Sequence, residues 1–388
     1  MIFYDSLVAV FWTAIAIVVY AYVGYPVILA MLGVFRKKRP ASQAMARLPR
    51  ISLLISAYNE ERIIEKKIEN SLALNYPRDL LDIIVISDAS TDTTDAIVKR
   101  YADRNVLLAR CEGHIGKTAC LNKIVPGTQG EIIVFSDANS QYDTEALNHL
   151  VENFSDPSIG WVTGTTRYES STGEGRVSSA GLYTRIERIT KVLESAIGSC
   201  IGADGAIFAI RRHLYRPLHE SDINDFVIPA MIKEQGYDGV LALKAYCIER
   251  SAGSVSGEFR RQVRITTRTL RAIFNHRGLL NPFRHPLFAF ELTSHKLMKF
   301  IVPFALCALF IANILIILTN NNLLYIALFG FQAIVYALWI ADSLGIRISF
   351  LSGPCRIAQT FCAVNLAILI GWIKFFRGEK FTTWATGR

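Results

Sequence analysis

Three long stretches of the chain carry no charged residue, and they constrain the fold more than any other feature. They cover residues 7–35, 300–341 and 357–373 of the 388-residue sequence. A helix of about 20 apolar residues crosses the roughly 30 Å hydrocarbon core of a bilayer. The segment between the first two stretches has the mixed composition of a globular domain. We therefore predict a membrane protein with one large water-soluble domain, and we exclude disordered, collagen-like and disulfide-rich chains.

Basic residues beside the apolar stretches predict the topology. The sequence Arg-Lys-Lys-Arg follows the first stretch at 36–39, and a series of arginines and lysines lies between 260 and 299. Such residues mark the cytoplasmic side of a membrane. We predict a multi-pass protein of the cytoplasmic membrane with its N-terminus outside and its soluble domain inside. Basic residues gathered at membrane edges suit lipid headgroups and argue against nucleic-acid binding.

The apolar stretches divide into helices of different kinds. The first is too long, and its positive charges lie on the wrong side, for a cleavable signal peptide. Asn320, Asn321 and Asn322 split the second stretch into two spans, 300–319 and 323–341. The third is short, contains Gln359 and Asn365, and is followed by basic residues. We predict that residues 355–375 form an interfacial or re-entrant helix on the cytoplasmic side, leaving three true spans.

The soluble region alternates short apolar strands with helices. Strands are predicted at 51–56, 82–87, 106–110 and 131–136, and helices at 60–74, 91–102, 117–125 and from about 143. This alternation is typical of a parallel, doubly wound α/β sheet. In such sheets ligands bind at the carboxyl ends of the strands. The seven cysteines form no CxxC motif, which indicates reduced thiols and no zinc site.

Polar residues follow three of the predicted strands. They are Ala57-Tyr58-Asn59-Glu60, the segment 88–92 that begins with Asp88, and Asp137-Ala138-Asn139. Each segment alone is what a helix cap requires. Three such tips on one sheet edge can instead bind a divalent cation or the hydroxyls of a nucleotide.

A glycine-rich segment, 113–118, offers a competing interpretation. It resembles the end of a phosphate-binding P-loop, but Cys111 stands where that motif requires its first glycine. Two strand–helix units also precede it, whereas a P-loop normally follows the first strand. The sequence contains no GxGxxG. Nucleotide hydrolysis and dinucleotide binding are therefore disfavoured.

Taken in order and spacing, a set of motifs resembles the family 2 glycosyltransferases. The resemblance is to the membrane-integrated branch with the hyaluronan, chitin, cellulose and poly-N-acetylglucosamine synthases. The motifs are ISAYNEE (55–61), VISDASTDTT (85–94), GKTACLN (116–122), VFSDANSQYD (134–143), VTGTTRY (162–168), GADGAIFAIRR (202–212), SDINDFVIP (221–229), EFRRQVRITTR (258–268) and WATGR (384–388). The likeness covers nearly the whole chain and implies a GT-A (Rossmann-like) cytoplasmic domain with transmembrane helices and amphipathic interface helices.

The resemblance also implies a role for each matching residue. Asp88 and the turn from Ala57 to Glu60 would contact the uracil and ribose of a UDP-sugar, with Lys117 near the nucleotide. Asp137 and Asn139 stand at the metal-binding DxD motif, for Mg²⁺ or Mn²⁺. The remaining implied site residues are Asp204 beside the acceptor, Asp225 as general base, Arg261 and Arg264 in the QxxRW region, and Trp384 and Arg388 in a terminal loop that closes over the diphosphate.

The sequence departs from the family pattern at three places. Asn139 replaces the second aspartate of DxD, and Asn224 precedes Asp225 where many members have glutamate. In QxxRW the glutamine is Arg261 and the tryptophan is Ile265. Because that tryptophan stacks beside the acceptor sugar in the family, the acceptor contact differs here.

The implied activity is inverting transfer from a UDP-sugar to a growing β-linked polysaccharide, in a processive manner. The alternative is a single transfer to a lipid-linked acceptor. Simpler roles also exist for single residues: Asp225 as cap of a helix over 226–236, Arg264 as a lipid-facing residue, and Trp384 as an interface anchor. A neighbouring carboxylate, Asp222, is expected to raise the pKa of Asp225.

Five segments follow from these interpretations. They are a transmembrane helix (1–35), the glycosyltransferase domain (36–257), amphipathic interface helices (258–299), a transmembrane hairpin (300–341) and the interfacial helix with the terminal loop (342–388). The expected partners are the donor, a glycan acceptor and membrane lipids. A homo-oligomer is left open.

Overall fold

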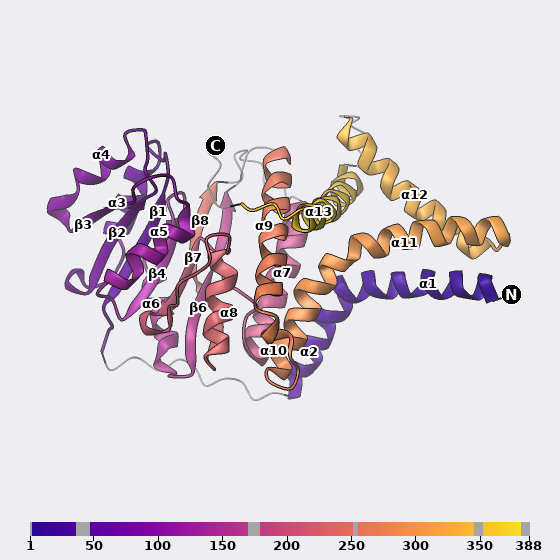
Figure 1. Cartoon of the computed structure of the whole chain (residues 1–388), viewed down its shortest axis with the longest axis horizontal. Coiled ribbons are helices and arrows are strands. Elements are labelled where there is room, and N and C mark those ends of the chain that lie inside the picture. The colour runs from indigo at the N-terminus through magenta and orange to yellow at the C-terminus, as the bar shows by residue number, and fades with distance from the viewer. Residues whose placement is uncertain (1, 36–46, 170–178, 251–254, 345–351, 382–388) are drawn as a thin grey trace.

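A computed structural model describes residues 2–35, 47–169, 179–250, 255–344 and 352–381. Figure 1 shows an α/β domain at one end and long membrane helices at the other, with two upright helices, α7 and α9, between them. The helices α7 (Ser179–Ile197) and α9 (Val255–Asn275) thus form a layer between sheet and membrane segments.

One eight-stranded sheet forms the centre of the α/β domain, in the order β3-β2-β1-β4-β7-β6-β8-β5. Its first four strands are parallel, because each returns to the same edge through a helix. The strands are β1 (Ile51–Ala57), β2 (Leu81–Ser87), β3 (Val106–Arg110), β4 (Ile132–Asp137), β5 (Gln141–Tyr142), β6 (Ile159–Glu169), β7 (Ile207–Arg211) and β8 (Asp238–Arg250).

Short helices connect the strands. They are α3 (Ile64–Leu72), α4 (Thr94–Lys99), α5 (Lys117–Ile124), α6 (Ala146–Val151) and α8 (Asn224–Glu234), with 3₁₀ turns η2 (Arg78–Leu80), η3 (Ala102–Arg104), η4 (Val125–Gly127), η5 (Glu152–Ser155) and η6 (Arg212–Leu214). A further 3₁₀ turn, η7 (Arg277–Leu280), follows α9. One apolar core packs α3, α4 and α6 against one sheet face. A second core continues from Phe135 of β4 to Ile368 of α13, so it joins the sheet to the membrane-side helices.

Long apolar helices make up the other end of the molecule. They are α1 (Ile2–Val19), η1 (Tyr20–Gly24), α2 (Tyr25–Phe35), α10 (Pro286–Leu292), η8 (Thr293–Leu297), α11 (Met298–Thr319), α12 (Leu323–Ser343) and α13 (Ser352–Phe376). The elements η1 and η8 are single π-turns that interrupt otherwise continuous helices. By length and composition, four helical segments among the described residues can cross a membrane: Ile2–Phe35, Pro286–Thr319, Leu323–Ser343 and Gly353–Phe376.

Most predicted elements are confirmed. The four predicted strands match β1 to β4 to within a residue at each end, and the break between α11 and α12 lies at Asn320–Asn322. The predicted helix 60–74 is shorter and starts at Ile64, because the preceding residues form a turn bonded to the β2–α4 loop. A four-span count rests on length and composition alone, so the three-span topology stays a prediction.

The prediction of a parallel sheet is wrong for two strands, β7 and β5, whereas β6 and β8 pair in parallel. Strand β7 runs antiparallel to both β4 and β6. The chain enters β7 at Ile207, which pairs with Ser136 at the carboxyl end of β4. Because β7 begins where β4 ends, it must run in the opposite direction to β4. The sheet is therefore mixed, with a parallel nucleotide-side half.

Candidate active site

The three polar tips predicted from the sequence meet at one edge of the sheet. Ala57 at the end of β1 pairs with Ser87 at the end of β2, and Ser56 pairs with Asp137 at the end of β4. Adjacent parallel strands place their carboxyl ends side by side, which brings Asp88 next to this row. The prediction that these tips share one edge is confirmed.

Asp88 holds the glycine-rich loop in place. Its side chain is almost fully buried and accepts hydrogen bonds from the backbone N–H groups of Ile115 and Gly116, both at 2.9 Å. The Nδ1 of His114 lies 2.8 Å from its Oδ2. The loop that resembles a P-loop therefore directs these amides at a protein carboxylate. Contact between Asp88 and a nucleotide stays a prediction.

A stacked pair of rings joins this loop to the turn after β1. The ring of Tyr58 lies 3.9 Å from the ring of His114, at an angle of 21°. Asn59 follows Tyr58 in the turn after β1 and has a positive φ of 53°, which asparagine tolerates. Its Oδ1 accepts a hydrogen bond from Thr91 N–H at 2.8 Å. An aromatic pair beside polar backbone is a suitable platform for a planar base. His114 was not among the predicted site residues.

Lys117 connects the loop to the tip that is predicted to bind metal. Its Nζ donates to Asp137 Oδ1 at 2.6 Å, and the Asp137 side chain is 37% exposed. Asn139 follows two residues later and is partly exposed. Mg²⁺ is typically bound by one or two carboxylates together with substrate phosphates. One accessible carboxylate and one amide oxygen fit this mode, although no cluster of three acidic, histidine or cysteine ligands occurs among the described residues.

A buried lysine lies behind the tip and was missed by sequence reasoning. Lys67 of α3 is fully buried, donates to the carbonyl of Ser140, and has its Nζ 4.0 Å from the ring centre of Tyr142. Ser140 also donates to Glu249 at 2.6 Å. Burial lowers the pKa of Lys67 to about 7, although nearby acidic groups oppose this. These residues fix the turn that presents Asp137.

Asp225 is the second residue of α8. The N-cap of this helix is Ile223, so the simpler role of Asp225 as the helix cap is wrong. Burial of Asp225 raises its pKa, and the charges of Lys117 and Arg268 oppose this effect. The like charge near it is Asp204, not the expected Asp222, whose carboxylate accepts from His219 N–H at 2.8 Å. The raised pKa suits a general base.

The loop that contains Asp204 encloses the carboxylate of Asp225. A Cβ atom on Gly205 would lie 2.8 Å from Asp225 Oδ2, so only glycine fits here without displacement. Asp204 itself accepts from the N–H and the hydroxyl of Thr166, at 3.0 and 2.9 Å. Asp204 therefore holds the loop; its predicted contact with the acceptor is untested.

Arg268 of α9 is the second residue that sequence reasoning missed. It donates to the carbonyls of Ser221 and Asp222, and its Nη2 lies 3.4 Å from Thr118 Oγ1. Burial lowers its pKa to about 10, with Asp225 opposing this and Arg264 adding to it. Arg268 of the interface helix thus joins the first turn of α5 to the loop before α8.

The other predicted residues lie farther along the same helix or outside the described chain. Arg264 is partly buried, one turn before Arg268. Arg261 is at the more exposed end of α9 and pairs with Glu258 at 3.2 Å. The predicted residues Trp384 and Arg388 lie outside the described residues.

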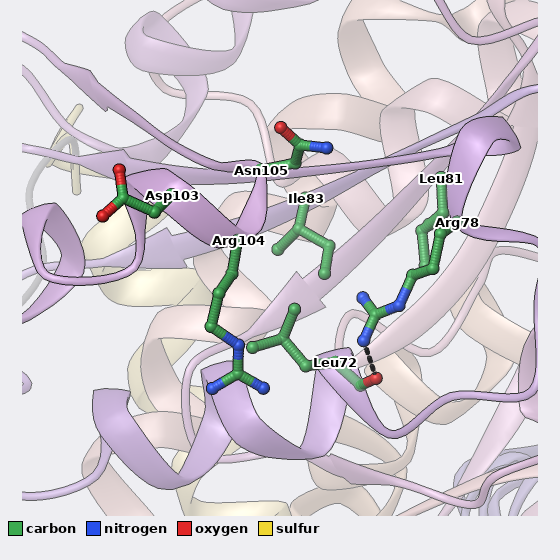
Figure 2. Close-up of a pocket in the computed structure, with 7 residues that line it drawn as sticks. All are labelled: Leu72, Arg78, Leu81, Ile83, Asp103, Arg104 and Asn105. Carbon is green, nitrogen blue, oxygen red and sulfur yellow. Dashed lines mark hydrogen bonds between the residues drawn. The ribbon is translucent and has the colours of Figure 1, made fainter.

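A separate cavity of about 230 Å³ lies away from these residues. It is bounded by the starts of β2 and β3, at the edge of the sheet opposite to the tips, and Figure 2 shows Arg78 and Arg104 directed toward it. Arg78 donates to the carbonyl of Leu72, and Arg104 pairs with Glu69 at 2.8 Å. Its arginines are engaged by the protein, so we do not assign it to the site.

The fold defines a class of protein, a GT-A type domain joined to long apolar helices that by length and composition can cross a membrane. Residues 52–216 match the model of glycosyl transferase family 2. The chain therefore carries a family 2 glycosyltransferase domain, as its motifs predicted.

Known relatives resemble only part of this chain. The beta-monoglucosyldiacylglycerol synthase of Nostoc sp. is 35% identical over 131 residues, which is 33% of this chain and 28% of the relative. The poly-beta-1,6-N-acetyl-D-glucosamine synthase of Staphylococcus aureus is 32% identical over 119 residues, 30% of this chain and 28% of the relative. The matched segment thus spans less than a third of the length of these relatives.

One solved structure matches almost the whole fold. The mannosyltransferase PcManGT from Pyrobaculum calidifontis, in complex with GDP-Man and Mn²⁺, has a TM-score of 0.73 and 21% identity, over 96% of this chain and 100% of that chain. The likeness extends to the membrane-side helices, so it confirms the combined architecture of the GT-A domain and apolar helices.

Proposed function

We propose that the protein is a membrane-bound, inverting hexosyltransferase that transfers a sugar from a UDP-sugar to a growing β-linked polysaccharide. One observation carries the proposal: Lys117 bonds to Asp137 and its charge also acts on Asp225. Asp137, assigned to the leaving group, and Asp225, assigned as the general base, therefore both lie near the ammonium group of Lys117. This is the arrangement that sugar transfer from a diphosphate donor needs.

The chemistry assigned to the base follows from its surroundings. Asp225 takes the proton of the acceptor hydroxyl as the oxygen attacks the anomeric carbon. No second carboxylate serves as nucleophile in this scheme, so one displacement inverts the anomeric centre. An α-linked donor then gives a β-linked product. The arginines of α9, Arg264 and Arg268, supply positive charge on the membrane side.

The site residues fit a divalent cation. Asp137, with the amide oxygen of Asn139, would hold Mg²⁺ or Mn²⁺ together with the diphosphate of the donor. Such a cation neutralises charge that develops on the leaving group. The Mn²⁺ in the PcManGT complex supports this choice of metal class. Lys117 adds a further countercharge beside Asp137.

A lipid acceptor is the second candidate, and two observations favour it. Ile265 stands where the polysaccharide synthases have the tryptophan that stacks on the acceptor sugar. The Nostoc relative is named a glucosyl-diacylglycerol synthase. A lipid acceptor would reach the site from the layer formed by α7 and α9, directly beside the membrane helices.

We infer a location in the cytoplasmic membrane, with the catalytic domain inside and the N-terminus outside. The helix α13 would lie along the cytoplasmic face. In Figure 1 it is seen nearly end-on, while α1 runs across the page, so the two helices do not share a direction. A C-terminal tag should therefore be protected from protease added to intact cells, and cleavage from outside would overturn this topology.

A donor and acceptor panel tests the proposed function. The purified full chain in detergent, with Mn²⁺, is given UDP-glucose, UDP-N-acetylglucosamine, UDP-galactose or GDP-mannose, and release of the nucleotide diphosphate is measured. Products formed with and without added diacylglycerol or polyprenyl phosphate are analysed by mass spectrometry. A ladder of polymer lengths supports the first candidate, and a single sugar on a lipid supports the second. No release with any donor would overturn both, provided that the protein is folded.

A further inference from the structure

A buried cluster of charged residues lies where α2, α7 and η8 meet, and the proposed chemistry does not use it. Its centre is His295, whose side chain is fully buried. The Nδ1 of His295 lies 2.6 Å from Glu194 Oε1, and its Nε2 lies 2.9 Å from Glu187 Oε2. Lys299 donates to the other oxygen of Glu187.

The hydrogen-bond geometry defines the protonation of this ring. A neutral imidazole has one donor and one acceptor, whereas carboxylates only accept. Burial raises the pKa of Glu187, but the charges of Lys299 and His295 hold it well below its ordinary value, so Glu187 is ionised. Both ring nitrogens can satisfy their partners only if both carry hydrogen. The cluster then has two positive groups facing two carboxylates.

The cluster is attached to the membrane helices through hydrogen bonds at two π-turns. Tyr25, which follows η1, donates from its hydroxyl to Glu194 Oε1 at 2.8 Å. The hydroxyl of Tyr20 in η1 lies 2.7 Å from Ser294 Oγ in η8. Single π-turns inside helices are frequently found at functional sites. Here both π-turns lie at the contact between membrane helices and α7.

The same glutamate reaches the loop that encloses the base. Glu194 Oε2 accepts from the N–H of Ile201 at 3.4 Å, just after the end of α7. Two residues on, Ala203 N–H donates to the carbonyl of Asp225 at 2.7 Å. Gly205 then packs against the Asp225 carboxylate. A short series of bonded groups thus connects His295 to the backbone of the base.

We propose that His295 is a positioning residue for transfer: as an imidazolium between Glu187 and Glu194 it fixes the end of α7, and through Ile201 it sets the loop 200–205 against Asp225. The proposal rests on the proposed function for its kinetic consequence. Other charged groups near the cluster, Lys191, Lys296 and Glu291, do not make this bridge between two carboxylates. The proposal gives His295 no contact with donor or acceptor, because its side chain is fully buried between the two glutamates.

Hydrogen exchange tests the positioning role independently of activity. In His295→Gln, we expect amide exchange in residues 199–206 to accelerate by about tenfold or more, while exchange in 113–118 stays unchanged. Ser294→Ala is the matched control, because it removes the Tyr20 contact on the same π-turn and leaves both glutamates bonded. It should leave exchange in 199–206 within about twofold of wild type.

Kinetics and a double variant complete the test. His295→Gln should lower kcat about tenfold, since small displacements of a base are costly, with KM for the nucleotide sugar within about twofold. In the double variant Glu194→Gln with His295→Gln, the positive imidazolium and one of its carboxylates are removed together. No buried carboxylate then loses its partner at Glu194, so kcat should exceed that of His295→Gln alone.

The outcomes separate the two proposals. Unchanged exchange in 199–206 of a folded His295→Gln protein would overturn the positioning role, whatever the enzyme transfers. Altered exchange in a protein that turns over no donor would retain the structural link and overturn the proposed function. Strictly additive effects in the double variant would show that the two side chains act independently and would also contradict the proposal.

Discussion

The two halves of the site are built in different ways. The strand-tip half consists of residues 57–60, 88–92, 113–118 and 137–139, and its parts follow neighbouring parallel strands. The membrane-side half consists of the loops 200–205 and 221–225 with α9. Its contacts join distant parts of the chain: Thr118 Oγ1 donates to the carbonyl of Asp222 at 2.9 Å, and Arg268 reaches both.

This difference separates what each half depends on. In the strand-tip half, the register of the sheet fixes which tips are neighbours. The membrane-side half is held by α7 and α9. Helix α9 packs on the membrane-side helices through the second core, and α7 packs on α2 and α10 through a separate, smaller apolar cluster. Changes in the first half should therefore weaken donor and metal binding. Changes in the second should lower turnover and leave donor affinity nearly unchanged.

The largest expected effect comes from the base. Asp225→Asn should lower kcat about 10³-fold, because the amide cannot take the acceptor proton. Affinity for UDP, measured by calorimetry, should stay within about threefold of wild type, because the residue acts on the acceptor. Normal turnover in this variant would show that Asp225 is not the general base. It would also contradict the assignment of turnover to the membrane-side half.

Removal of the metal or of its carboxylate should have the next largest effect. Excess EDTA, or Asp137→Ala, should lower kcat/KM about 10²-fold, because the diphosphate then lacks a countercharge. Added Mn²⁺ should restore the chelated wild type but not the variant. Full activity in chelator would show that the turn at Asp137 only terminates β4.

Arg268 allows the membrane-side half to be examined through pH dependence. Asp225 acts as a carboxylate, so its activity is lost as pH falls through its pKa. The charge of Arg268 lowers that pKa, and Arg268→Ala should therefore move the acidic limb of the kcat profile to higher pH. We expect kcat at neutral pH to fall about tenfold, because two loop carbonyls also lose their donor.

Arg261→Ala is the matched control for this variant. Its guanidinium lies on the same helix but pairs with Glu258 at the more exposed end. The main charges that act on Asp225 are those of Lys117, Arg268, Asp204 and Lys191, so the acidic limb should not move in Arg261→Ala. Equal shifts in the two variants would show that general loss of positive charge, rather than the contact with the loop before α8, causes the effect.

The sequence predicts the strand-tip half well, for a physical reason. Strand ends, turn residues and their order are local features, so the pattern of residues alone places Asp137 and the turn from Ala57 to Glu60 at one edge. The mixed half of the sheet does not follow from local pattern, because the direction of β7 depends on how α7 returns the chain. Asp204 as the like charge beside Asp225 depends on the same connection.

The residues that sequence reasoning missed depend on packing between distant segments. His295 lies about a hundred positions from its glutamates, and no periodicity connects them. Two others left a weak signal. Arg268 follows Arg264 by four residues, on one face of α9. Lys67 lies on the apolar face of α3, next to Ile64 and Ile68, where a charge must have a partner.

The smallest expected effect on activity comes from Lys67, on the strand-tip side. Its pKa of about 7 in the folded protein lies below the ordinary 10.5. Between these values the unfolded chain binds a proton that the folded chain has lost. Stability therefore rises with pH across this window, by up to about 1.4 kcal/mol per pH unit. Below pH 7 both states are protonated and the gain is absent.

Lys67→Met should abolish this pH dependence. Other groups titrate alike in both proteins, so the difference in Tm between wild type and variant, measured in detergent from pH 7 to 9.5, isolates Lys67. Wild type should gain stability relative to the variant as pH rises, while kcat changes only about twofold, because Ser140 still donates to Glu249 and the turn keeps its shape. If the two Tm curves run parallel with pH, the pKa of Lys67 is not lowered in the folded protein. A large loss of activity in Lys67→Met would show that the strand-tip half, like the membrane-side half, depends on contacts with a neighbouring helix, here α3.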